Sequence, residues 1–311
     1  MRFEVTILGT SGALPAYGRH CSGVFLRTEH EDVLIDCGEG TQMQLRSLGL
    51  NLGRTSTILI THLHGDHYFG LPGLLTSLAL YDRKTPLTIL SPPHLRARLA
   101  PLLELDRFDF PFSLEFREFT AKDLTPVISL KSLELFAFPL RHRIETNGYL
   151  LREKERPANI RKEKIEEYDI PWPAIREIKG GGDFVTATGE RILHQELTIP
   201  PAPPRSFAYC SDTLHFPELA NFVRGVDLLY HEATFLHELR EDAHAKGHAT
   251  AREAALTARD AGVGTLVMGH FSSRYPDVSA HEEEARAIFP NSFAAHDGWK
   301  FSVPYLGRSE E

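Results

Sequence analysis

Cysteines and long apolar segments are both scarce in this chain of 311 residues. Its three cysteines, Cys21, Cys37 and Cys210, are too few and too scattered for a disulfide scaffold, which favours a reducing compartment. No stretch of about 18 or more apolar residues occurs, so no membrane-spanning helix is expected. The opening residues also lack the apolar run of a secretory signal. The sequence therefore predicts a cytoplasmic protein that does not enter the membrane.

A general excess of positive charge is also missing, because 34 Lys and Arg residues stand against 42 Asp and Glu residues, a net charge of −8. This balance excludes a protein that coats nucleic acid with its whole surface, but it allows a local basic patch. With 42% hydrophobic residues the composition is that of an ordinary folded protein, long enough to bury a large core. The unusual feature is the presence of 16 histidines.

Strand-like and helix-like apolar patterns alternate along most of the chain. Alternating or β-branched apolar runs predict strands at residues 3–8, 24–26, 32–36, 56–61, 87–90, 207–209 and 265–268, with a strand-rich stretch from 114 to 140. Apolar residues at helical spacing predict helices at residues 41–48, 71–80, 94–103, 249–261 and 280–288. Mixed alternation over this length predicts an α/β layered architecture rather than a helix bundle or an all-strand barrel.

One segment, residues 152–195, differs in composition from the rest of the chain. Between Arg152 and Lys164 six basic residues stand against three acidic ones, a local charge of about +3 (6 − 3) in an otherwise acidic protein. Two interpretations follow. The segment is either a solvated surface helix and loop, or an extruded arm that grips an anion. A proline-rich stretch, residues 200–204, then leads stiffly back to the strand at 207–209.

The densest polar cluster follows the predicted strand that ends near Ile60. His62, His64, Asp66 and His67 lie within six residues there, and such groups are costly at the edge of a core unless something satisfies them. Side chains alternate along a strand, so His62 and His64 can point to one side. Gly65 allows a turn that brings the other two residues to the same point. Imidazole and carboxylate groups are suitable ligands for Zn²⁺ or a similar ion.

Three further polar residues each follow a predicted buried strand. His142 comes after the apolar run 135–140, Asp212 after the strand at 207–209, and His270 after the strand at 265–268. Sites of layered α/β proteins gather at such strand ends. A single histidine after a strand is more often a capping or surface residue, but several such placements together favour a metal site. A pair of metal ions would explain four candidate ligands in one short stretch.

These residues lie in motifs that resemble the ribonuclease Z family, the tRNA 3′-processing endoribonucleases of the metallo-β-lactamase superfamily. The histidine cluster HLHGDH at 62–67 resembles the superfamily signature. The branch-specific similarities run in order along nearly the whole chain: LGTSG at 8–12 with Pro15 and Arg19, DCGEGTQ at 36–42, HEATF at 231–235, GHATA at 247–251 and HFSSRY at 270–275.

The resemblance implies a metallo-β-lactamase-like αββα sandwich over residues 1–311, with residues 152–195 inserted as a tRNA-binding arm. It implies two Zn²⁺ ions per subunit, a precursor tRNA substrate and a homodimer. The expected reaction is endonucleolytic removal of the 3′ trailer, which leaves a 3′-hydroxyl on the tRNA and a 5′-phosphate on the trailer. Carried over by position, the ligands of one metal are His62, His64 and His142, those of the other are Asp66, His67 and His270, and Asp212 bridges both.

Catalytic roles follow from what phosphodiester hydrolysis requires. Asp66 is expected to orient the attacking water and accept its proton, and His248 to protonate the leaving oxygen, with Glu232 holding the tautomer of His248. The alternatives are that His248 caps the helix that it opens and that Glu232 is purely structural. Asp36 is expected to hold a ligand imidazole through its other ring nitrogen. The candidate substrate contacts are Arg19, Ser272 and Arg274, although Arg274 could equally form an internal salt bridge.

Two other functions compete with this interpretation. The first is a metallo-β-lactamase-fold hydrolase of small phosphodiesters or other esters. The second is a non-catalytic RNA-binding protein with a structural zinc ion, but structural zinc sites are closed, four-coordinate and often rich in cysteine. The inferred ligand set contains no cysteine and leaves room for water, which argues against the second alternative.

Overall fold

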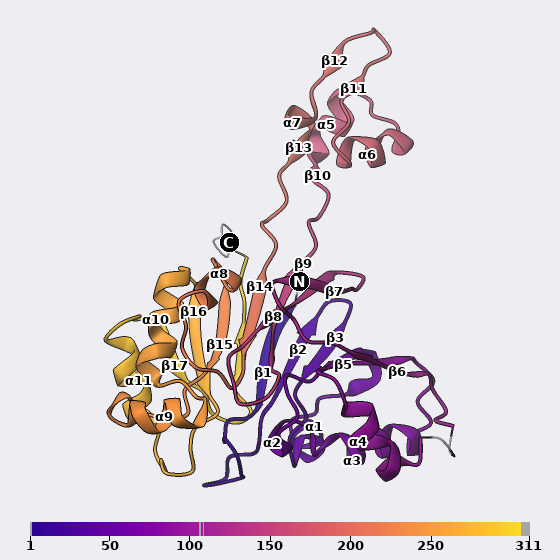
Figure 1. Ribbon diagram of the computed structural model, residues 1–311. Coiled ribbons are helices and arrows are strands. Elements are labelled where there is room, and N and C mark those ends of the chain that lie inside the picture. Colours follow the sequence, from indigo (N-terminus) through magenta and orange to yellow (C-terminus); the bar gives the residue numbers. More distant parts are fainter. Residues whose placement is uncertain (1, 106, 108, 306–311) are drawn as a thin grey trace. The chain divides into compact units, whose positions relative to one another are not determined.

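The computed structural model describes residues 2–105, 107 and 109–305 (Figure 1). The chain divides into two compact units. Among the described residues, those of 2–152 and 206–303 form the first, here called the core unit, and those of 153–205 with 304–305 form the second, here called the arm unit. The insertion of one unit into the other follows from the chain order alone, because residues 153–205 separate two consecutive stretches of the core unit.

The first sheet of the core unit has seven strands, in the order β18-β1-β2-β3-β4-β5-β6. Strands β3 to β6 pair in parallel, whereas β18, β1, β2 and β3 pair antiparallel. The strands are β1 (Phe3–Gly9), β2 (Gly23–Thr28), β3 (Asp32–Ile35), β4 (Thr55–Leu59), β5 (Leu87–Ser91), β6 (Leu114–Glu118) and β18 (Lys300–Ser302). The helical segments between them are α1 (Thr41–Ser47), the 3₁₀ turn Leu52–Arg54, α2 (Gly65–Tyr68), α3 (Leu71–Leu80) and α4 (Leu95–Leu103).

The second sheet of the core unit also has seven strands, in the order β17-β16-β15-β14-β9-β8-β7. Strands β14 to β17 pair in parallel, and β9 is antiparallel to β14. The strands are β7 (Thr125–Ser129), β8 (Leu133–Pro139), β9 (Asn147–Glu153), β14 (Ser206–Cys210), β15 (Leu228–Glu232), β16 (Thr265–Gly269) and β17 (Ser292–Ala294). The helical segments are α8 (Leu219–Phe222), the 3₁₀ turn His237–Leu239, α9 (Arg240–Lys246), α10 (Ala251–Ala261) and α11 (Ser279–Arg286).

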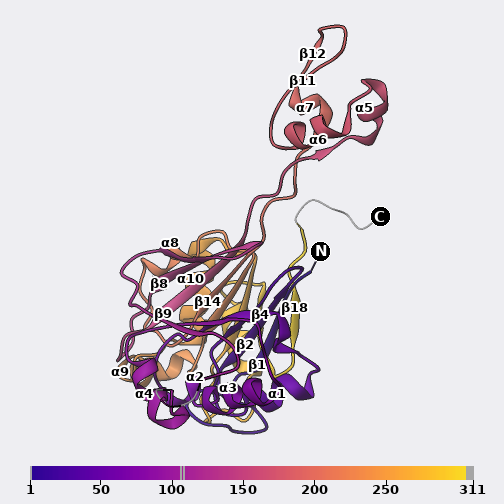
Figure 2. The same ribbon diagram turned by 90° about the vertical axis from the view of Figure 1, so that its right-hand side faces the viewer.

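Three buried apolar clusters arrange these elements in four layers, which lie side by side in Figure 1 and one behind another in Figure 2. The central cluster lies between the two sheets, where residues of β1 such as Val5 meet residues of β14 such as Tyr209. A second cluster packs α8, α10 and α11 on the outer face of one sheet. The third packs α1, α3 and α4 on the outer face of the other. The predicted αββα sandwich is therefore confirmed.

Most predicted strands and helices occur within one or two residues of their expected positions. One boundary was wrong: α10 begins at Ala251, not at 249, because the side chain of Thr250 accepts the N–H of Glu253 in a capping box. His248 therefore does not open a helix, and Thr250 takes the capping role. The core unit also contains elements that were not predicted: strands β9, β15, β17 and β18, and helices α2, α8 and α9. Among the described residues, no helix combines the length and the apolar character needed to cross a bilayer.

The arm unit is built from short elements around a small core. Strand β10 (Asn159–Ile160) pairs with β13 (Thr198–Ile199), and β11 (Phe184–Val185) pairs with β12 (Arg191–Ile192). The helices are α5 (Lys162–Glu167), α6 (Trp172–Lys179) and α7 (His194–Leu197). The buried apolar cluster of the unit consists of Ile170, Ile178, Ile192 and Leu197. The buried side chains of Glu153 and Arg205, at the two ends of segment 153–205, form an ion pair. Arg205 Nη2 lies 2.8 Å from Glu153 Oε1.

Candidate metal centre

The loop after β4 carries the dense histidine cluster. His62 and His64 lie in this loop, and the short helix α2 carries Asp66 and His67. The helix turns the chain sharply, so that four side chains from six consecutive residues face one point. His62 and His67 are fully buried, which shows that these imidazoles belong to the interior of the site and not to the surface.

The second sheet supplies the remaining candidate ligands from strand ends. His142 follows β8, Asp212 follows β14 and His270 follows β16. Asp212 and His270 are 2% and 3% exposed, respectively. Together with residues of the loop after β4 and of α2, and with His248, these three residues form three groups of donor atoms that lie within 4.8 Å of one another: His62, His64, His142 and Asp212; Asp66, His67 and His270; and Asp212, His248 and His270.

The first donor group contains His62, His64, His142 and Asp212. The Nε2 atom of His62 lies 3.1 Å from Nδ1 of His64, which lies 3.3 Å from Nε2 of His142. Asp212 Oδ2 lies 3.5 Å from His62 Nε2 and 3.7 Å from His142 Nε2. Donors at about 2.0–2.1 Å from one tetrahedral zinc ion would be roughly 3.3–3.4 Å apart, so this group has the spacing of a coordination shell.

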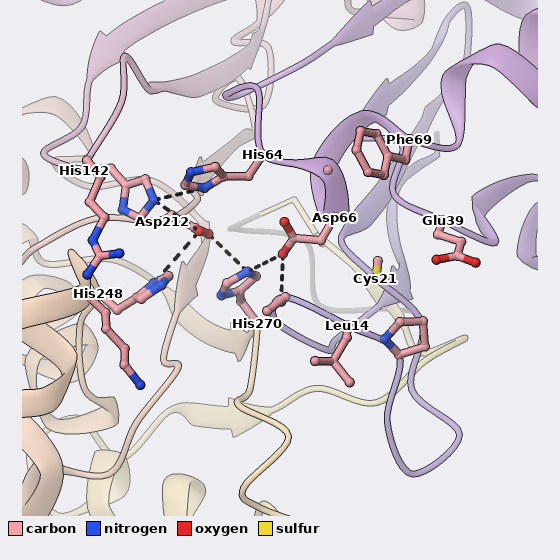
Figure 3. Close-up of a pocket in the computed structure, with 15 residues that line it drawn as sticks. Leu14, Cys21, Glu39, His64, Asp66, Phe69, His142, Asp212, His248 and His270 are labelled. Atoms are coloured by element: carbon pink, nitrogen blue, oxygen red, sulfur yellow. Dashed lines mark hydrogen bonds and ion pairs between the residues drawn. The ribbon is translucent and has the colours of Figure 1, made fainter.

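The second donor group contains Asp66, His67 and His270, and the other oxygen of Asp212 completes it. Figure 3 shows Asp66, Asp212 and His270 of this group. His270 Nε2 lies 3.3 Å from both Asp66 Oδ2 and Asp212 Oδ1. His67 Nε2 lies 3.5 Å and 3.4 Å from the same two oxygens. Asp212 thus directs Oδ2 into the first group and Oδ1 into the second, which is the arrangement of a carboxylate that bridges two ions.

The hydrogen-bond partners of the outward-facing ring nitrogens show whether these histidines are oriented to bind metal ions. His67 Nδ1 donates to the Asp36 carboxylate at 2.8 Å, as expected for Asp36, and His142 Nδ1 donates to the carbonyl of Gly247 at 2.7 Å. Both acceptors lack hydrogens, so Nδ1 carries a proton, and Nε2 is the inward-facing atom that can bind a cation once its own proton is displaced. Lone pairs and carboxylates that converge in a buried space need a cation between them. The donor set therefore fits a metal site.

Electrostatics at the centre favour positive charge. Burial lowers the pKa of His62 to about 3, so this imidazole is a neutral donor at physiological pH. Burial also opposes a charge on His67, yet the carboxylates of Asp66, Asp212 and Asp36 raise its pKa well above the usual value. A cation in this space would be attracted by the same carboxylates.

His248 and Glu232 form a second polar cluster beside the donor groups. His248 Nδ1 lies 3.1 Å from Glu232 Oε1, and its ring stacks on His270 at a centroid distance of 5.4 Å. Glu232 is fully buried and also accepts the N–H groups of Thr213, Thr234 and Ala249. Although burial lowers it, the Glu232 and Asp212 carboxylates raise the pKa of His248 to about 9, so the imidazole is protonated at neutral pH.

The three predicted substrate contacts do not line the cleft at the metal centre. Arg19 Nη2 donates to the main-chain oxygen of Tyr275 at 2.8 Å, which ties the opening motif to the 270–275 stretch. Ser272 Oγ accepts the N–H of Arg274 at 3.3 Å. Arg274 Nη1 pairs with Asp242 at 3.2 Å, the salt bridge that the sequence analysis left open. Their contact with substrate stays a prediction.

The cleft that opens onto the donor groups has a volume of about 620 Å³ and includes residues that the motif reasoning did not single out. Arg143 and Lys246, next in sequence to His142 and Gly247, line it, and so do Leu14 and Phe69. Figure 3 shows Leu14 and Phe69 across the donor groups from His248. Each of these lining residues lies within three positions of a candidate ligand or of a motif named above. This proximity in the sequence was the signal that could have identified them as residues of the cleft.

Known proteins resemble this chain over nearly its whole length. A ribonuclease Z of Bacteroides thetaiotaomicron is 42% identical over 302 residues, which cover 97% of this chain and 96% of the relative. A ribonuclease Z of Porphyromonas gingivalis is 42% identical over 301 residues, which cover 97% and 99% of the two chains. This chain belongs to the ribonuclease Z family. The family model of the anti-Pycsar protein Apyc1 matches residues 3–104 alone, in the first third of the chain.

Solved structures agree with this assignment. The short form of human tRNase Z is 28% identical, with a TM-score of 0.71, and the match covers 97% of this chain and 99% of the human chain. The metallo-β-lactamase fold protein YhfI of Bacillus subtilis is 17% identical, with a TM-score of 0.68, over 97% of this chain and all (100%) of its own. The second similarity identifies the fold, and the sequence relatives identify the family.

Proposed function

We propose that this member of the ribonuclease Z family uses two zinc ions to remove the 3′ trailer from tRNA precursors, leaving a 3′-hydroxyl on the tRNA and a 5′-phosphate on the trailer. The ribonuclease Z relatives support the reaction. The observation that carries the metal count is the position of Asp212, whose two oxygens face two separate groups of imidazole nitrogens.

The proposed ligands follow from the two donor groups. His62, His64 and His142 would hold one ion, Asp66, His67 and His270 the other, and Asp212 both. When bound, a pair of such ions lowers the pKa of water toward neutrality and neutralises charge on the phosphoryl oxygens. Asp36 and the carbonyl of Gly247 keep the outer ring nitrogens of His67 and His142 protonated, which orients both rings.

The proton transfers are assigned to two residues on different elements. Asp66 Oδ2 accepts the main-chain N–H of Ala13 at 2.8 Å, which holds the carboxylate where it can take a proton from the attacking water. The water oxygen bonds to phosphorus as the bond to O3′ breaks. His248, held by Glu232 at 3.1 Å, gives its proton to O3′, so that the products are a 3′-hydroxyl and a 5′-phosphate.

We propose that residues 152–195 bind the tRNA body as an arm, within the single metallo-β-lactamase-like domain of residues 1–311. The excess of basic residues between Arg152 and Lys164 supports this role. Trp172, at the start of α6, is 83% exposed and offers a flat surface to a base or sugar. A homodimer in the cytoplasm completes the proposal, and sedimentation of the purified protein tests the subunit number.

The deciding experiment compares two substrates with and without a chelator. Purified protein is incubated with a tRNA precursor that carries a 3′ trailer, and the product ends are mapped. The same protein is assayed on a small chromogenic phosphodiester. Chelator-sensitive cleavage directly after the tRNA body supports the proposal. Efficient turnover of the small substrate without cleavage of the precursor would instead support a hydrolase of small phosphodiesters or other esters.

A further inference from the structure

The cleft at the metal centre has two chemically different edges. His142 and His248 lie on one side of the donor groups, and Leu14 and Phe69 lie on the other (Figure 3). The first edge is cationic, whereas the second combines apolar side chains with the exposed carboxylate of Glu39. A nucleic-acid strand that crosses this cleft therefore meets positive charge on one side of the reacting phosphate, and apolar surface beside a negative charge on the other.

Two hydrogen bonds build the cationic edge. Arg143 Nη2 donates to the carbonyl of Ala245 at 2.7 Å, and His142 Nδ1 donates to the carbonyl of Gly247 at 2.7 Å. These bonds join two segments that are about a hundred residues apart, and they place Lys246 beside Arg143. Gly247 has a φ of 80°, and a Cβ atom there would lie 2.8 Å from His142 Nδ1, so the close approach requires glycine.

The charges of Arg143 and Lys246 are not neutralised by a carboxylate of the described chain. Arg143 contacts a main-chain carbonyl, and Lys246 Nζ lies 5.2 Å from the ring centroid of Phe235. By contrast, Arg274 nearby pairs with Asp242. Two uncompensated cations at the rim of a phosphodiesterase centre are suited to a second phosphate of the substrate.

The apolar edge presents an exposed but supported aromatic ring. Phe69 is 63% exposed, and Leu14 on the same edge is 51% exposed. The ring of Phe69 packs on Gly65, where a Cβ atom would collide with it. Gly65 thus makes room for the ring as well as starting α2. The main-chain N–H of Ala13 bonds Asp66, which holds the segment that carries Leu14. An exposed, fixed ring of this kind suits the stacking of an unpaired base.

We propose that these two edges set the direction of the RNA strand across the centre: Arg143 and Lys246 bind the phosphate on the tRNA side of the scissile bond, and Phe69 receives the first base of the trailer. The inference rests on the proposed function. His248, which protonates O3′, lies on the cationic edge. Because O3′ belongs to the last tRNA nucleotide, the tRNA side of the strand must run along that edge and the trailer along the other.

A double cycle of enzyme and substrate changes tests the cationic edge. The substrates are tRNA precursors in which one phosphate is replaced by a neutral methylphosphonate, either directly 5′ or directly 3′ of the scissile phosphate. The double variant Arg143→Ala/Lys246→Ala should cleave the unmodified precursor about tenfold or more slowly in kcat/KM, the loss expected for charge-assisted hydrogen bonds. Arg143→Lys keeps the charge and should recover part of this loss.

The position of the phosphate decides the direction. Neutralising the tRNA-side phosphate should slow the unchanged enzyme but add nothing to the defect of the double variant, because the interaction is already lost. Neutralising the trailer-side phosphate should slow both proteins equally. The reverse pattern, or equal effects at both positions, would overturn the proposal. Lys131→Ala, which removes an exposed cation before the start of β8, far along that strand from His142, is the matched control and should behave as the unchanged enzyme.

The apolar edge is tested with a trailer whose first nucleotide lacks its base. Phe69→Ala and the abasic substrate should each lower kcat/KM, and their combination should be no worse than either alone. Additive losses would overturn the assignment of Phe69. Failure of the proposed function is distinguishable, because the unchanged enzyme would then leave the unmodified precursor uncut. A small phosphodiester has neither neighbouring group, so its hydrolysis by each variant measures any effect on the centre itself, and the effects on precursor cleavage are expressed relative to it.

Discussion

The core unit and the arm unit differ in how firmly they hold their side chains. In the core unit, two seven-stranded sheets enclose a buried cluster, and the proposed ligands lie in the segments that follow strands of these sheets or on the short helix α2. In the arm unit, four buried apolar residues support strands of two residues each. A metal centre must keep its donor atoms a few ångströms apart, and the large sheets of the core unit provide that rigidity. Contacts to a large RNA surface need less precise positions, so the small buried cluster of the arm unit is sufficient for them.

The comparison predicts that the two units can be damaged separately. The largest effect is expected from Asp212→Ala, which removes the carboxylate shared by both donor groups. Hydrolysis of the tRNA precursor and of a small phosphodiester should both fall to background, and the bound metal per chain should decrease. Metal analysis and turnover on both substrates check this. Asp260→Ala removes an exposed carboxylate of α10 and should change neither. Retained hydrolysis in Asp212→Ala would contradict the bridging role.

A smaller effect that depends on the substrate is expected from His248→Ala. Loss of the general acid should slow precursor cleavage by about 10²–10⁴-fold, because the departing O3′ needs a proton. A p-nitrophenyl phosphodiester has a stable leaving anion and should be affected far less. Although burial lowers the pKa of His248, the Glu232 carboxylate raises it. Since the protonated form is the active one, cleavage of the precursor should decline at alkaline pH in the unchanged enzyme and not in the variant. Equal losses on both substrates would contradict this role.

Removal of the arm should weaken binding of the tRNA precursor without changing hydrolysis at the metal centre. Replacing residues 155–192 by a short glycine-serine linker should weaken precursor binding by about tenfold or more, the loss expected for one or two charge-assisted contacts. Hydrolysis of the small phosphodiester should be preserved. Binding titrations and steady-state kinetics measure the two quantities. An equal decrease of both activities would mean that the arm supports the core unit and does not grip the substrate.

The smallest effect on hydrolysis is expected from a substitution that opens a cavity in the buried cluster of the arm unit. Ile178→Ala removes a buried side chain, at a cost of about 2–5 kcal/mol to the local fold. Hydrogen exchange should accelerate within residues 159–199 and remain unchanged in the two large sheets. Ile199→Ala, at a residue that is 48% exposed, is the matched control and should alter exchange little. Faster exchange in the sheets of the core unit would show that the two units are not independent.

The sequence predicted the layers and the convergence of donors because both leave strong local signals. A buried strand followed at once by polar residues marks a strand end, as at His62, Asp212 and His270. The same reasoning could not find Arg143 and Lys246 as neighbours, because Arg143 reaches the carbonyl of Ala245 from a distant part of the chain. The motif containing Arg19 was found, but its contact with the main-chain oxygen of Tyr275 depends on tertiary packing.

The arm was harder to predict for a related reason. Its buried residues, among them Ile170 and Ile192, are isolated in a charged sequence, so no helical or strand period is visible. The start of α10 was misplaced because alanines on both sides of Thr250 fit a helix equally well, and the capping box decided the boundary.

Zinc titration of the metal-free protein tests the central claim most directly. Precursor cleavage and bound zinc are measured together as zinc is added, and the product ends are mapped. The account predicts that cleavage reaches its maximum at two zinc ions per chain and that every product pair carries a 3′-hydroxyl on the tRNA and a 5′-phosphate on the trailer. Full cleavage by the metal-free protein, or saturation at one ion per chain with both donor groups intact, would contradict it.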